Sequence, residues 1–245
     1  MTLNDILKFV FPSRCIMCDE VLPYGNKLSN EYLCDECRKK LEYIRKPTCK
    51  KCGAMVGDES DTYCVRCKID MHDNFISGFG LLRYNDFVKE SLHRIKYAKR
   101  KEYIYFYGKM IAKMYRERFK KIAPDCFIPV PISKERLRIR NFNQASVLAY
   151  TISDELKRYG IDIPVNENII YRTKNTEVLN KLDNNDRKGE LHDAFYVNPS
   201  EDIEKVILID DIYTTGATID TISGVLKEAG IKDIYFTVIT VVDNL

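Results

Sequence analysis

No apolar run in this sequence approaches the roughly 18 residues that a bilayer-spanning helix needs. Residues 1–11 include Asp5 and lack the basic start and the small-residue cleavage site of a signal peptide, so we expect no integral membrane segment and a cytoplasmic location. Histidine is scarce, with three residues in 245, and no histidine motif supports a Cys-His nucleophile. Hydrophobic residues (45%) and charged residues (31%) occur in ordinary globular proportions, which excludes a disordered or fibrous chain.

The net charge of +3 conceals an uneven distribution along the chain. Residues 1–74 hold 12 basic and 12 acidic side chains, residues 75–145 hold 17 and 6, and residues 146–245 hold 10 and 18, so the balances are 0, +11 and −8. A basic field in the middle third is typical of a surface that meets phosphates or nucleic acid, although solvated helix faces give the same count.

Eight of the nine cysteines form four C-x-x-C pairs: Cys15/Cys18, Cys34/Cys37, Cys49/Cys52 and Cys64/Cys67. A reducing compartment disfavours disulfides, whereas two such pairs complete the tetrahedral four-sulfur shell that zinc prefers. The spacing therefore predicts two structural zinc ions in a small module spanning residues 1–74. Consecutive pairing gives two zinc ribbons, and an interleaved arrangement remains open at this stage. The ninth cysteine, Cys126, starts an apolar run and is expected to fill the core.

Residues 75–245 alternate between strand and helix patterns, which predicts an α/β domain with a parallel sheet. Strands are expected at 76–84, just before Pro129, at 205–209 and at 234–242. Helices are expected from about residue 86, around 103–114, from 143 or 144 to Gly160, and at 217–229.

The segment 206–218 reads V-I-L-I-D-D-I-Y-T-T-G-A-T, with two carboxylates at the end of an apolar strand and a small-residue loop entering a helix. Such a loop lets backbone amides and a helix N-terminus meet a phosphate. The string resembles the 5-phosphoribosyl-1-pyrophosphate signature of type I phosphoribosyltransferases at every position. The resemblance implies a ligand site, with magnesium accompanying the pyrophosphate, formed by Asp210, Asp211, Thr214, Thr215, Gly216, Ala217 and Thr218.

The two cysteine modules, the run 129–144 and the segment 206–218 together resemble the ComF family of competence and DNA-uptake proteins. In that family the second run occupies the pyrophosphate loop, and the residues that match it here are Arg136, Arg138, Arg140, Phe142, Asn143 and Gln144. Asn141 stands where glycine is usual, and asparagine tolerates a positive φ angle. A family element is present at 92–97, where Lys96, one helical turn from His93, would either act in a phosphate clamp or lie on a solvated helix face. A further stretch is partly present as Arg172, Thr176, Leu182, Arg187, Ala194 and Phe195, with Leu179 and Glu190 departing from it.

Two features of the basic region allow opposed interpretations. Arg136, Arg138 and Arg140 alternate, so they cannot share one face of a helix, but an extended loop would let them converge on phosphates. Tyr103, Tyr105 and Tyr107 neighbour the basic run 99–101 and would either stack on bases or belong to the core.

Three functions follow from these patterns. The first, implied by the family resemblance, is the binding of single-stranded DNA during uptake together with a phosphoribosyl ligand or nucleotide. The second is catalysis of phosphoribosyl transfer to an unidentified base. The third makes the zinc module an adaptor for an uptake helicase or other competence proteins.

Overall fold

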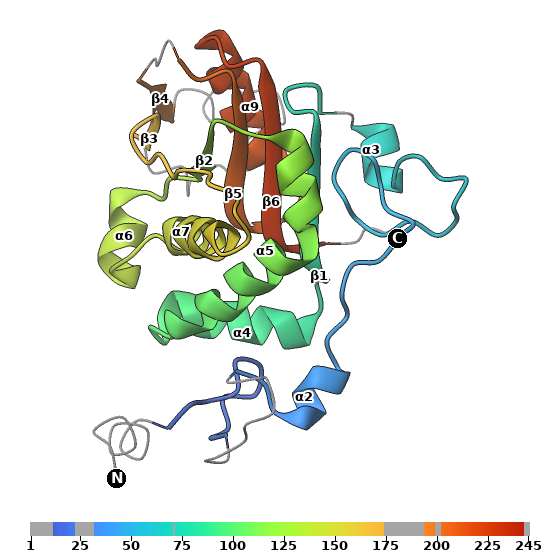
Figure 1. The fold of residues 1–245 in the computed structure, drawn as a ribbon, viewed down its shortest axis with the longest axis vertical. Coiled ribbons are helices and arrows are strands. Elements are labelled where there is room, and N and C mark those ends of the chain that lie inside the picture. The colour runs from blue at the N-terminus through green and yellow to red at the C-terminus, as the bar shows by residue number, and fades with distance from the viewer. Residues whose placement is uncertain (1–11, 23–31, 71, 174–193, 199–201, 243–245) are drawn as a thin grey trace, which may run out of the picture.

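A four-stranded parallel sheet forms the centre of the protein (Figure 1). The computed structural model describes residues 12–22, 32–70, 72–173, 194–198 and 202–242. The strands are β1 (Ser77–Arg83), β2 (Cys126–Pro129), β5 (Lys205–Tyr213) and β6 (Asp233–Val241), in the order β1-β6-β5-β2. This arrangement confirms the predicted parallel α/β domain.

Helices cover both faces of the sheet because its strands are apolar on both sides. On β5, Ile207 and Ile209 join the core formed with α4 (Asp86–Tyr97), α5 (Glu102–Ile122) and α7 (Gln144–Lys157). Val206 and Leu208 point the other way, into the core formed with α9 (Ala217–Glu228). Figure 1 shows α5 and α7 on one side of the sheet and α9 on the other.

Local sequence explains where the helices begin and end. Asn85 caps α4 by accepting a hydrogen bond from the Val88 amide at 2.9 Å, and Asn143 caps α7 through the Ala145 amide at 3.0 Å. Gly160 follows α7 with a φ of 73°, as its position in the sequence predicts. Cys126 lies in the core as expected, and burial raises the pKa of its thiol to about 12.

The basic stretch after β2 is a helix, α6 (Lys134–Arg140), and the expectation of an extended loop there is wrong. Ser133 caps the helix by accepting a hydrogen bond from the Arg136 amide at 3.2 Å. Asn141 then ends it in the left-handed region with a φ of 65°, which confirms that asparagine supports the turn in place of glycine. Arg136 and Arg140, four residues apart, consequently lie on the same side of the helix, and Arg138 lies on another side.

The N-terminal residues form two separate four-cysteine units, the first around α2 (Asp35–Lys39) and the second around α3 (Val65–Ile69). Short antiparallel bridges, Arg14 with Val21 and Thr48 with Met55, give each unit the hairpin of a ribbon. The first unit packs into the core of α4, α5 and α7, and the second into the core of α9. The two ribbons therefore lie on different parts of the α/β domain (Figure 1).

A two-stranded antiparallel sheet, β3 (Ile170–Arg172) with β4 (Phe195–Val197), completes the described structure. Arg172 and Phe195, two residues of the family stretch that is only partly present, lie in this sheet, and Ala194 of the same stretch directly precedes β4. Thr176, Leu182 and Arg187 of that stretch, with Leu179 and Glu190, lie outside the described residues. Over the part of the chain that the structure describes, none of the helices combines the length and the apolar character required to cross a membrane.

Candidate functional site

The eight paired cysteines form two four-sulfur clusters by consecutive pairing. Cys15, Cys18, Cys34 and Cys37 make up the first, Cys49, Cys52, Cys64 and Cys67 make up the second, and the sulfur atoms of each lie within 4.8 Å of one another. This settles the pairing that the spacing left open.

The donor set of each cluster fits zinc. Four thiolates on two tight turns supply the closed sulfur shell of a structural zinc site. Two backbone amides reinforce the first cluster, since the Cys34 amide donates to Cys15 Sγ at 3.5 Å and the Cys37 amide donates to Cys34 Sγ at 3.4 Å. None of the eight cysteines forms a disulfide. A zinc ion bound here would hold the ribbon turns together and supply no open position for catalysis.

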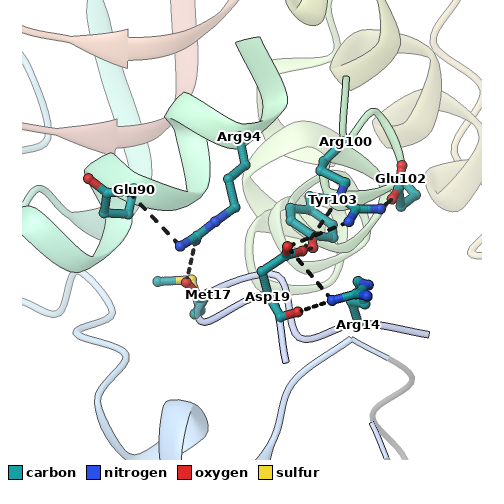
Figure 2. A network of polar contacts seen from close by, with 8 residues as sticks. All are labelled: Arg14, Met17, Asp19, Glu90, Arg94, Arg100, Glu102 and Tyr103. Atoms are coloured by element: carbon teal, nitrogen blue, oxygen red, sulfur yellow. Dashed lines mark hydrogen bonds and ion pairs between the residues drawn. The ribbon is translucent and has the colours of Figure 1, made fainter. Parts of the chain in front are cut away.

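Asp19 anchors the first ribbon to the helical layer (Figure 2). Its carboxylate accepts a hydrogen bond from the Tyr103 hydroxyl and pairs with the Arg100 guanidinium at 3.5 Å. Arg94 of α4 adds a hydrogen bond from Nη1 to the Met17 carbonyl oxygen at 2.6 Å. Figure 2 shows these side chains converging on the ribbon turn from α4 and from the start of α5. Some of the basic residues of the middle third are thus engaged in holding the ribbon.

Asp210 and Asp211 lie within β5, which extends to Tyr213, so the prediction that the strand ends at Ile209 is wrong. Pairing with β6 on one side holds the strand in extended form as far as its last residue. The two carboxylates still occupy the carboxyl-terminal edge of the sheet, where open α/β sheets bind ligands.

Asp211 is buried and makes two contacts with side chains of the covering helices. Lys96 of α4 forms an ion pair with Asp211 Oδ2, and Gln144 at the start of α7 donates from Nε2 to Oδ1 at 3.4 Å. Burial by itself raises the pKa of Asp211, but the Lys96 ammonium and the hydrogen bonds outweigh it and lower that pKa below its ordinary value. Asp211 is therefore the charged member of the pair.

Asp210 has the opposite electrostatic character. Burial, and then the negative charge of Asp211, raise the pKa of Asp210 well above its ordinary value. Its Oδ1 accepts a hydrogen bond from the Asp211 amide at 2.8 Å. A carboxyl that takes up a proton next to a charged one can either donate to a ligand oxygen or, after losing its proton, accept from a ligand hydroxyl.

The loop after β5 presents its residues to solvent at the start of α9. Thr214, Thr215 and Ala217 are exposed, Thr218 is half-buried, and Gly216 is buried. The helix that follows has 12 residues, and its first amides carry the partial positive charge that favours an anion. The structure thus brings Asp210, Asp211 and the 214–218 loop to one edge of the sheet, together with Lys96 and Gln144.

The three predicted loop arginines occupy different environments on α6. Arg138 is exposed and Arg136 is half-buried, whereas Arg140 is buried with its guanidinium 5.6 Å from the ring centre of Tyr97. Asn143 does not reach the carboxylates, because its Nδ2 donates to the Val130 carbonyl oxygen at 3.0 Å.

A basic and aromatic surface forms where the end of α4 meets α6. Tyr97 is 56% exposed, and Lys101 lies 5.8 Å from the ring centre of Phe142. Lys99, between them in the sequence, is exposed. We call Tyr97, Lys99, Lys101, Arg140 and Phe142 the basic-aromatic surface. Of the tyrosines considered for base stacking, Tyr103 and Tyr107 are buried in the core, and Tyr105 is 38% exposed.

Sequence reasoning missed two residues at the 214–218 loop. Arg66, in α3 of the second ribbon, donates to the Thr214 carbonyl oxygen, and His72 contacts the Thr215 carbonyl oxygen at 2.9 Å. Nothing in the local sequence connects them to the loop, because Arg66 and Thr214 are separated by 148 positions.

The fold and the two cysteine sites define an α/β protein with an N-terminal double zinc ribbon. The family model "Double zinc ribbon domain" matches residues 6–68. Competence protein ComFC of Bacillus subtilis is 31% identical over 211 residues, covering 82% of this chain and 80% of that protein. The chain therefore belongs to the ComF family of competence and DNA-utilisation proteins.

Other relatives match over most of their lengths. Competence protein ComFC of Streptococcus pneumoniae is 27% identical over 231 residues, covering 90% of this chain and 96% of that protein. DNA utilization protein YhgH of Escherichia coli is 23% identical over 224 residues, covering 89% of this chain and 92% of that protein. Among solved structures, a purine phosphoribosyltransferase from Pyrococcus horikoshii aligns with a TM-score of 0.31 and 15% identity, over 54% of this chain and 70% of that one.

Proposed function

We propose that this protein binds single-stranded DNA during DNA uptake and that its α/β domain carries a second site for a phosphoribosyl ligand. The observation that supports the proposal most strongly is the placement of the 206–218 segment. Its carboxylates and exposed loop lie at the carboxyl edge of a parallel sheet. The curated relatives are named for competence or DNA utilization. The proposal includes a cytoplasmic location and a division into a ribbon module, 1–74, and a ligand-binding domain, 75–245.

The phosphoribosyl ligand would place its 5-phosphate on the 214–218 loop. The first amides of α9 and the threonine hydroxyls offer donors to the phosphate. Asp210 would accept from the ribose hydroxyls, and it is also the carboxyl best placed to meet a magnesium ion, since Asp211 is already paired with Lys96. Gln144 Oε1 is buried with no hydrogen-bond partner among the described residues, and a ligand hydroxyl would supply one.

Single-stranded DNA would lie along the basic-aromatic surface. Lys99 and Lys101 are exposed and would neutralise backbone phosphates, while the exposed Tyr97 ring offers a base a stacking partner. Residues 75–145 carry a balance of +11 and residues 146–245 a balance of −8, so the strand would follow the former and avoid the latter.

Phosphoribosyl transfer is a second candidate, because the signature for the ligand is intact. In that reaction a nitrogen of the base would bond to C1 of the ribose as the pyrophosphate leaves with its electron pair, and the nitrogen would lose its proton. Release of pyrophosphate from phosphoribosyl pyrophosphate, in the presence of each nucleobase in turn, measures this directly.

The proposal is tested by calorimetry with magnesium and phosphoribosyl pyrophosphate, run beside a titration with labelled single-stranded DNA. We expect the wild-type protein to bind both ligands. Asp210→Asn should abolish binding of phosphoribosyl pyrophosphate and leave DNA binding unchanged, whereas Asp154→Asn, at an exposed carboxylate of α7, should change neither. Wild-type protein that binds neither ligand would overturn the proposal.

A further inference from the structure

Two side chains of the ribbon module, Arg66 and His72, contact two carbonyl groups of the 214–218 loop, which we call the phosphate loop. Arg66 Nη1 donates to the Thr214 carbonyl oxygen, and His72 Nε2 lies 2.9 Å from the Thr215 carbonyl oxygen. Arg66 is placed between Cys64 and Cys67, two of the four sulfur ligands of the second cluster. The cluster that orders α3 therefore also orders the group that contacts the loop.

His72 lies between two acceptors. Its Nδ1 is 3.4 Å from Asp220 Oδ2 in the first turn of α9, and its Nε2 faces a carbonyl oxygen, which can only accept. Two facing acceptors favour the doubly protonated ring, and the hydrogen bond with Asp220 raises the pKa of the buried His72 above its ordinary value. Asp220 is itself held by the Asn74 amide, which donates to Oδ1 at 3.4 Å.

Both the backbone turn and the close approach of His72 require glycine at position 216. Its φ of 87° suits glycine, and a Cβ at this position would lie 2.6 Å from His72 Nε2 and closer still to the Tyr213 hydroxyl oxygen. The missing side chain thus makes room for the second ribbon on the inner side of the loop. The position that the sequence motif assigns to phosphate approach is also the position where the ribbon packs.

The two contacts fix the direction of two peptide groups. In a planar trans peptide the N–H points opposite to the C=O. Because the Thr214 and Thr215 carbonyls turn toward Arg66 and His72, the amides of Thr215 and Gly216 turn away from the ribbon. Amides held in this way need no rearrangement when a phosphate binds, and preorganised donors bind with less loss of entropy.

We propose that Arg66 and His72 are positioning residues for the phosphate loop, and that the second zinc site, unlike the first, is coupled to the binding of a phosphate-bearing ligand. This inference rests on the proposed phosphoribosyl site. Coupling between two sites is reciprocal, so the ligand must also strengthen retention of the second zinc ion.

The test compares full-length, zinc-loaded variants in calorimetry with magnesium and phosphoribosyl pyrophosphate. Arg66→Ala and His72→Ala should each weaken binding by about tenfold, within the range typical of coupled sites. Lys68→Ala is the matched control, because it removes a charge from the same helix and Lys68 pairs with Asp61, away from the loop. This variant should bind the ligand as the wild type does. Arg66→Lys, which keeps a donor on a long side chain, should recover most of the affinity, and all variants should bind DNA normally.

A second measurement needs no substitution in the ribbon. A chromogenic chelator should remove one of the two zinc ions several-fold more slowly when phosphoribosyl pyrophosphate is present, and Asp210→Asn should eliminate this protection. Equal affinity of Arg66→Ala, His72→Ala and wild-type protein, or unprotected zinc in a wild type that binds the ligand, would overturn the inference alone. A wild type that does not bind the ligand would overturn the proposed phosphoribosyl site first, and the inference with it.

Discussion

The Lys96 ammonium contacts the Asp211 carboxylate, joining α4 to the strand that carries the ligand signature. The side chains are 19% and 7% exposed, so this is a nearly buried ion pair. Lys96 therefore has a defined partner inside the protein before any ligand arrives. Of the two signature acids, Asp210 is the one left without a cationic side chain in direct contact among the described residues, which assigns the two carboxylates different tasks.

Breaking this pair should destabilise the fold. We expect Asp211→Asn and Lys96→Met each to lower the free energy of unfolding by about 3 kcal/mol, because each leaves a group buried without its partner. The double variant should lose less than the sum of the two, by at least about 1 kcal/mol. Lys89→Met, at an exposed position of α4, should stay within about 0.5 kcal/mol of wild type in the same urea titrations. Additive losses would show that the pair contributes nothing.

Zinc content should be two ions per chain. Four thiolates in each cluster satisfy one tetrahedral shell, so native mass spectrometry of protein never exposed to chelator should show the mass of two zinc ions. Cys52→Ser should retain one. Chelation should lower the melting temperature markedly, because both ribbons contribute residues to the two cores of the domain. A wild-type mass with one zinc ion or none would contradict the assignment.

Stability should depend on pH through His72. The hydrogen bond with Asp220 raises the pKa of His72 above its ordinary value of 6.5, with help from the Thr215 carbonyl and the charge of Asp70, while burial opposes it. A raised folded-state pKa means that the stabilisation is complete below about pH 6.5 and is lost as the pH rises through the folded value. His72→Gln should therefore cost about 2 kcal/mol near pH 6 and progressively less toward pH 9. A cost that is constant over this range would indicate that the ring stays neutral.

DNA binding should respond differently to charge and to stacking on the basic-aromatic surface. Lys99→Ala with Lys101→Ala should reduce the slope of log affinity against log salt concentration by about 1.4, because each phosphate contact on a single strand contributes about 0.7 to that slope. Tyr97→Ala should weaken binding by about tenfold with the salt slope unchanged, because base stacking involves no counterion release.

The matched control for the lysine pair is Lys120→Ala with Lys121→Ala. It removes the same charge from the far end of α5, a 21-residue helix about 30 Å long, and should leave the slope as it is in wild type. Equal effects of the two pairs in fluorescence anisotropy would mean that the DNA follows net charge and no particular surface. The arginines of α6 are less suitable for this test, because Arg140 is buried against Tyr97 and its removal would disturb both elements.

The sequence by itself determined what depends on neighbours along the chain. Cysteine spacing predicted two four-sulfur sites, since two cysteines separated by two residues can present both thiolates to one ion from a single tight turn. The apolar run ending in Asp210 and Asp211, followed by small residues, predicted a strand, a loop and a helix, and the structure contains all three. Asn141 tolerated the left-handed turn for a reason that lies within one residue.

The tertiary structure alone decided what depends on contacts between distant segments. Pairing with β6 carries β5 on through Tyr213. The start of α6 is different, because its Ser133 cap contacts an amide only three residues away and belongs to the local sequence. Three further features join residues whose local sequences do not predict one another. They are the pairing of the cysteines, the Lys96 contact with Asp211, and the contacts of Arg66 and His72 with the 214–218 loop. Such contacts are selected by burial and charge complementarity once the layers pack, so no pattern along the chain could reveal them.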